Sequence, residues 1–159
     1  MTTFELLKDL TGPWQGTYQL QDPYNNLAVD SASTAIVTPL LGGRFVRLDY
    51  TWEYENQPQE GSILWGHEGD SDTITAYWID SWHVGDKVMV CRESDHDRSI
   101  ISVLGGYSAP PGPDWGWRTT IEPTEDPTGF RMTMYNITPD GQEDLAIGVT
   151  YKKAYSSGY

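Results

Sequence analysis

The strongest constraint on the fold is a strict alternation of apolar and polar side chains over nine consecutive residues, 46–54. A period of two is that of a β-strand with one buried face. Similar runs recur along the chain, separated by clusters of Gly, Pro, Asp and Asn, so the pattern predicts an antiparallel β-meander. The apolar or aromatic members of the first run are Val46, Leu48, Tyr50, Trp52 and Tyr54.

The same patterns predict about ten strands and one short helix, over 3–10. Ten strands joined by short turns favour an up-and-down barrel, whose closure removes the open edges of the sheet. We therefore expect an all-β fold with an antiparallel barrel behind a short N-terminal helix. The strands are expected at 14–20, 31–38, 46–54, 60–66, 73–82, 88–93, 99–105, 115–122, 130–137 and 145–151.

Length and charge limit the domain count and the partners. A chain of 159 residues fits a single domain, 1–159, with a helical segment at 1–11 and a flexible tail at 154–159. The net charge is −13, from 23 acidic and 10 basic residues. That field repels nucleic-acid phosphates and anionic lipid headgroups. We expect no nucleic-acid partner and no membrane partner.

The single cysteine, Cys91, excludes an internal disulfide and a multi-cysteine metal site. Its mid-strand position favours a small buried side chain over a reactive thiol. The first ten residues lack a basic region followed by an apolar stretch, so we expect no signal peptide. No window is long and apolar enough to span a bilayer. The expected location is cytoplasmic.

Several strands between residues 63 and 103 carry apolar side chains on both faces. A sheet with one face in water alternates instead. Either a second subunit covers the outer face, or the register shifts at a bulge; we favour a homodimer contact as the hypothesis. The apolar pairs are Ile63 with Leu64, Tyr77 with Trp78, Ile79 with Trp82, Met89 with Val90, and Ile100 with Ile101.

Short motifs in a fixed order resemble the uncharacterised DUF1579 family, over about residues 5 to 153. The resemblance implies a calycin-like barrel, the architecture of lipocalins and fatty-acid-binding proteins, and implies no settled activity. The motifs are 10–16 (LTGPWQG), 41–45 (LGGRF), 61–66 (G-x-x-x-x-G), 77–81 (YWIDS), 138–141 (TPDG) and 148–152 (GVTYK).

The triplet Gly12-Pro13-Trp14 also resembles the Gly-x-Trp of lipocalins, whose tryptophan plugs the closed end beneath a basic residue of the last strand. The resemblance implies that Lys152 or Lys153 takes that place. The lipocalin Thr-Asp-Tyr motif is missing. A more distant resemblance is to haem-binding nitrobindin-type barrels, but the chain has no histidine near its C-terminus to ligate haem. We expect no cofactor.

The best candidate for chemistry is Asp80, which lies between Trp78 and Trp82 in the alternation. A regular strand points these three side chains inward, which makes Asp80 a partly buried carboxylate that is costly unless hydrogen-bonded. Such a group often has a raised pKa, as a general acid or base needs. In the plainer alternative, Asp80 only accepts hydrogen bonds near the rim. Its potential partners are Arg92, Arg118, Tyr50 and Tyr135.

His83 lies just before the Val84-Gly85 turn and can pair with Asp80 or Glu93. A histidine–carboxylate pair is the minimum for acid–base catalysis, whereas most lone histidines near a turn are only solvated. His67 and His96 lie in acidic turns without metal-ligand spacing, so we expect no metal site. The runs 70–72 and 95–97 lack the spacing of calcium loops.

The aromatic residues are either a packed core or the wall of a pocket. A ten-strand barrel is wider than the eight-strand size that side chains just fill, which favours a cavity. The leading hypothesis is a binder of a small apolar or aromatic molecule. The alternatives are an enzyme with Asp80 and His83 as an acid–base pair, and an interaction protein that uses its outer strands. The expected ligand-binding residues are Tyr50, Trp52, Trp78, Asp80, Trp82 and Trp117.

Overall fold

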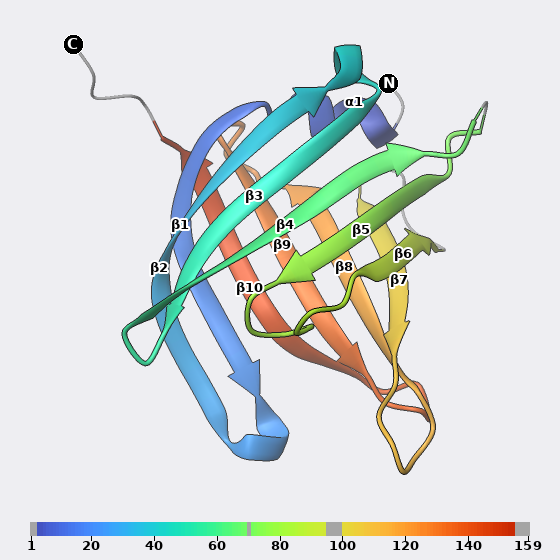
Figure 1. Ribbon diagram of the computed structural model, residues 1–159. Coiled ribbons are helices and arrows are strands. Elements are labelled where there is room, and N and C mark those ends of the chain that lie inside the picture. The colour runs from blue at the N-terminus through green and yellow to red at the C-terminus, as the bar shows by residue number, and fades with distance from the viewer. Residues whose placement is uncertain (1–2, 70, 95–99, 155–159) are drawn as a thin grey trace.

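The ten strands form one closed antiparallel barrel in the computed structural model, which describes residues 3–69, 71–94 and 100–154 (Figure 1). Each strand pairs with its neighbours in the chain, and β1 pairs with β10 to close the ring. The predicted all-β barrel is confirmed. The strands are β1 Gly12–Asp22, β2 Leu27–Leu40, β3 Phe45–Tyr54, β4 Gln57–His67, β5 Ile74–Asp80, β6 Met89–Glu93, β7 Ile101–Tyr107, β8 Trp115–Pro123, β9 Gly129–Ile137 and β10 Glu143–Lys153.

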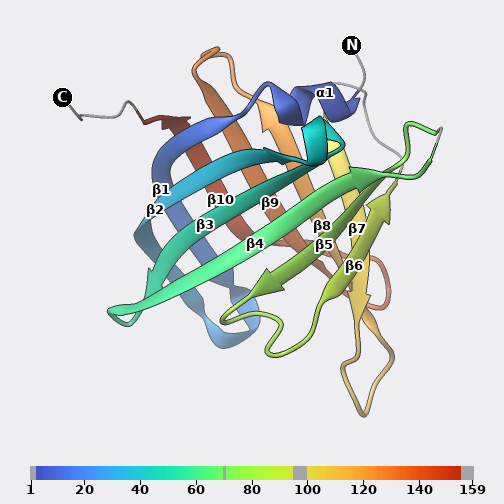
Figure 2. The ribbon, with the colours of Figure 1, turned by 45° about the horizontal axis from the view of Figure 1, so that its top comes forward.

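The short helix α1, Thr3–Lys8, lies across one end of the barrel (Figure 2). Phe4 and Leu7 are its buried residues and join the barrel core. Next to it, the Trp14 indole Nε1 donates to the Leu10 carbonyl at 2.7 Å. Lys153 Nζ lies 6.0 Å from the centre of the Trp14 ring, which is the arrangement that the lipocalin resemblance implies. This end of the barrel is therefore packed shut.

The alternation at 46–54 lies in β3 as expected. Val46, Leu48, Tyr50 and Trp52 are buried inside the barrel, and Tyr54 is partly buried where β3 ends. Most strand boundaries differ from the expectation by a few residues, and two of these differences have an identifiable cause. Strand β2 begins at 27 rather than 31, because its first residues pair with the end of β1. Strand β5 ends at 80 rather than 82, for a reason given below.

The barrel wall is unequal around its circumference. Strand β6 is the shortest strand, with five residues. It pairs with β5 from Met89 to Arg92. Its pairs with β7 within the described residues are Arg92 with Leu104 and Glu93 with Val103. Among the described residues, this junction therefore has the fewest paired positions of any in the barrel.

The apolar side chains on both faces of β5 and β6 follow from a continuous register. The β4–β5 and β5–β6 pairs run without a shift, so the bulge alternative does not explain them. Their outward members are in water: Tyr77 is 41% exposed, Ile79 48% and Val90 61%. We call these three residues the outer patch. The homodimer contact stays a prediction. In the described part of the chain, no helix is long and apolar enough to cross a membrane.

If the outer patch is a dimer contact, the chain elutes as a dimer in light scattering at micromolar concentration, and Ile79→Lys converts it to a monomer. The physical reason is that a buried, unpaired ammonium costs several kcal/mol. Val29→Lys, at another exposed apolar position on β2, is the matched control and leaves the mass unchanged. A monomeric wild type contradicts the prediction.

Candidate functional site

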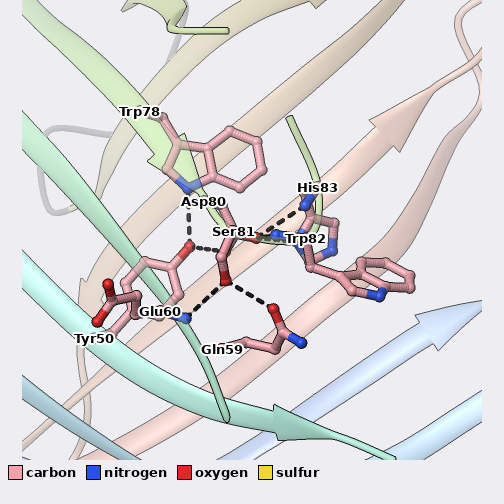
Figure 3. A network of polar contacts seen from close by, with 8 residues as sticks. All are labelled: Tyr50, Gln59, Glu60, Trp78, Asp80, Ser81, Trp82 and His83. Atoms are coloured by element: carbon pink, nitrogen blue, oxygen red, sulfur yellow. Dashed lines mark hydrogen bonds and ion pairs between the residues drawn. The ribbon is translucent and has the colours of Figure 1, made fainter. Parts of the chain in front are cut away.

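A single row of residues across three strands carries the polar centre of the barrel. Tyr50 of β3 is opposite Gly61 of β4, and Gly61 is opposite Asp80 of β5. A Cβ at position 61 would lie 2.2 Å from the Tyr50 Oη, so only glycine leaves room for that ring. Tyr50 therefore reaches across β4, and its Oη donates to Asp80 Oδ2 at 2.6 Å (Figure 3).

Asp80 is 3% exposed and ends its strand by binding the backbone that follows it. Its Oδ1 accepts from the backbone N–H of Trp82 at 2.8 Å and of His83 at 2.9 Å. An Asp side chain that binds backbone two and three residues ahead stabilises a turn in place of a strand. The chain therefore turns at Ser81, two residues before the alternation predicts.

The same turn brings the His83 ring back onto Asp80. His83 Nδ1 lies 3.1 Å from Asp80 Oδ1 (Figure 3). A regular strand through this region would have placed the two side chains on opposite faces. The predicted pairing of His83 with Asp80 is thus present, and it depends on the early end of β5. Glu93, the other predicted partner, accepts from the Ile74 backbone N–H instead.

The pKa of Asp80 is lowered, where the sequence suggested a raised value. Burial raises the pKa, but the hydrogen bond and the charge of His83 lower it, as do the hydrogen bonds from Tyr50 and the Trp82 backbone, and these outweigh burial. Asp80 is therefore a carboxylate at neutral pH. The two candidate arginines lie elsewhere: Arg118 pairs with Glu143 at 2.8 Å, and Arg92 with Glu68 at 2.5 Å.

Four indole rings surround the His83 ring. The ring centres lie 4.8 Å from it for Trp82, 5.4 Å for Trp52, and 5.7 Å for both Trp78 and Trp117. Trp78 also donates from Nε1 to the Tyr50 Oη at 2.9 Å, which joins this cage to the Asp80 network. The imidazole of His83 is therefore a polar ring whose neighbours are mainly indole rings.

A cavity of about 530 Å³ opens at the end of the barrel opposite α1. Of the predicted ligand-binding residues, Trp78, Trp82 and Trp117 line it, together with His83. Tyr50, Trp52 and Asp80 do not line it. Asp80 bonds to the His83 ring, Trp52 packs against that ring, and Tyr50 bonds to Asp80. The rest of the wall and the rim come from residues that sequence reasoning missed, among them Leu20, Tyr24, Lys87, Met89, Tyr107 and Asp144.

The other candidate residues lie away from this cavity. His67 is at the α1 end, where its ring packs against Phe4 with the two ring centres 4.9 Å apart. His96, Asp70 and the tail 155–159 lie outside the described residues. Within 3–69, 71–94 and 100–154, no three His, Cys, Asp or Glu side chains form a metal-binding group. Cys91 is buried, and burial raises the pKa of its thiol to about 12, so it is not a reactive thiolate.

The family now follows from comparison with known proteins. A family model described as "Protein of unknown function (DUF1579)" matches residues 2–153. The chain belongs to the DUF1579 family. Its barrel is similar to the crystal structure of Rv2717c from M. tuberculosis, with a TM-score of 0.62 over 96% of this chain and 98% of that one. At 9% identity the likeness shows the fold alone. No curated protein matches the sequence.

Replacing Asp80 by Asn lowers the free energy of unfolding by about 2 kcal/mol at neutral pH, because the amide removes the negative charge that four donors bind and turns one acceptor oxygen into a donor. The folded pKa lies below the unfolded value of about 3.9, so the carboxylate stabilises the fold above that pH and ceases to do so as the pH falls through the folded pKa. The difference between the two proteins therefore shrinks below about pH 3.9. Urea unfolding followed by tryptophan fluorescence measures it. Asp86→Asn, in an exposed turn, is the control.

The Gly61→Ala substitution tests whether Tyr50 needs the space above β4. The added methyl forces the ring off Asp80, and overpacking of this kind costs about 1–3 kcal/mol. Gly112→Ala, where the nearest atom to a Cβ is 3.8 Å away, leaves stability unchanged. Thermal unfolding of the two variants compares them. Equal melting temperatures would show that the Tyr50–Asp80 contact does not depend on Gly61.

Proposed function

We propose that this DUF1579 protein binds a small apolar or aromatic molecule in the cavity at the open end of the barrel. The observation that carries the proposal is the wall of that cavity, where Trp78, Trp82 and Trp117 meet around His83. Ligand sites typically measure 300–1,000 Å³, with mostly apolar walls and a few placed polar groups. A volume of about 530 Å³ fits that range.

The arrangement of the indoles supports a flat ligand. Trp78 and Trp117 stack with their ring centres 5.1 Å apart and 17° between their planes. Trp82 lies nearer the solvent and is 38% exposed, although a tryptophan of this size is usually covered. An aromatic ligand in the cavity covers Trp82 and extends the indole contacts already present.

An enzyme is the second candidate function, and the His83–Asp80 contact at 3.1 Å favours it. A histidine oriented by a carboxylate beside a cavity is the arrangement that general acid–base catalysis needs. Once a ligand is found, turnover of that molecule by the wild type, and its loss in His83→Ala, tests this candidate. An interaction protein, the third alternative, depends on the outer patch and on the oligomeric state.

The neutral fluorescent probe N-phenyl-1-naphthylamine tests the cavity directly. We expect it to quench tryptophan fluorescence and to stabilise the fold by about 2.7 kcal/mol at 100 times its dissociation constant. Ala146→Phe fills the cavity wall and abolishes binding, whereas Ala28→Phe, on the exposed face of β2, does not. Equal binding by the two variants, or none by the wild type near millimolar probe, would contradict the proposal.

A further inference from the structure

The two nitrogens of the His83 ring have different surroundings. Nδ1 is held by the Asp80 carboxylate, which also accepts from the Tyr50 hydroxyl and from the backbone N–H groups of Trp82 and His83. A carboxylate only accepts, so the Nδ1 of the imidazole carries the proton. In the neutral ring, Nε2 then has a free lone pair and is a hydrogen-bond acceptor.

Among the described residues, none donates a hydrogen bond to this Nε2, and the hydrogen bond of the ring is that of Nδ1 with Asp80 Oδ1. The His83 side chain is 10% exposed and lines the cavity. Around it are the faces and edges of four indoles. A molecule that fits here needs a flat apolar body for the indoles and a donor on its edge for Nε2.

The charges at the rim favour a donor that arrives uncharged. Asp22 and Asp144 line the cavity against one lysine, Lys87, and the whole chain carries −13. Such a field opposes the approach of a preformed anion such as a carboxylate. An aromatic hydroxyl is neutral in water at pH 7, so it enters without that penalty and meets the acceptor inside.

We propose that the ligand of this cavity is an aromatic molecule with an ionisable hydroxyl, and that the hydroxyl donates its proton to His83 Nε2. The inference rests on the proposed function and names the ligand class for it. If the proton crosses, the O–H bond breaks and an N–H bond forms on Nε2. The products are a phenolate and an imidazolium that keeps its Nδ1–H on Asp80. No proton is exchanged with the solvent.

Two probes that differ only at the hydroxyl test the proposal: 3-nitrophenol, which is mostly neutral in water at pH 7, and its methyl ether, 3-nitroanisole. Calorimetry gives both dissociation constants, and the visible band of nitrophenolate reports whether the proton has moved. We expect the wild type to bind the phenol about tenfold more tightly than the ether, which is the value of one good hydrogen bond.

The matched variants are His83→Asn and His83→Gln. The asparagine amide keeps a donor near Asp80 but places nothing at the Nε2 position, so the preference for the phenol disappears. The longer glutamine amide restores an acceptor there and recovers part of the preference. A role limited to folding would lower the affinity for both probes equally and leave their ratio unchanged.

Each result decides between the two proposals. Equal binding of phenol and ether by the wild type overturns the hydroxyl inference and leaves the proposed function standing. The hydroxyl inference is also overturned if 3-nitrobenzoate binds as tightly as the phenol, or if His83→Asn keeps the preference. No binding of any probe near millimolar concentration overturns the proposed function, and the inference with it.

Discussion

The burial of the Asp80 carboxylate is the constraint on which the rest of the site depends. A charge inside a barrel is tolerated only when its oxygens are fully bonded. Here two donors are backbone groups of the following turn, one is a tyrosine from another strand, and one is an imidazole. Meeting this one requirement ends β5, fixes the His83 ring, and requires a glycine in β4.

Much of the fold was predictable because it depends on a local rule. The alternation at 46–54 places the same side chains inside wherever the strand lies in the barrel, and the Gly and Pro clusters mark the turns. The rule fails at Asp80, where a side chain binds the backbone ahead of it. Alternation distinguishes only apolar from polar positions. The strand predicted from it was therefore two residues longer than β5, and His83 was predicted on the face opposite Asp80.

The cavity was less predictable because distant segments build it. The tryptophans of β5 and β8 were identified from their size, but the rim joins residues far apart in the chain. Tyr24 donates to Asp144 at 3.0 Å, for example, across 120 positions. The sign of the Asp80 pKa shift also depends on which donors surround it, and neither Arg92 nor Arg118 is among them.

The short strand β6 connects the stability of the barrel wall to whether a ligand occupies the cavity. The wall is a ring of ladders, and a ring opens where its ladder has the fewest hydrogen bonds. Among the described residues, that place is the junction of β6 with β7. Met89 of β6 and Tyr107 of β7 both line the cavity. A molecule that contacts both residues bridges β6 and β7 at this junction. Binding in the cavity and opening of the barrel wall are then linked equilibria, so a filled cavity makes the ring harder to open at this junction.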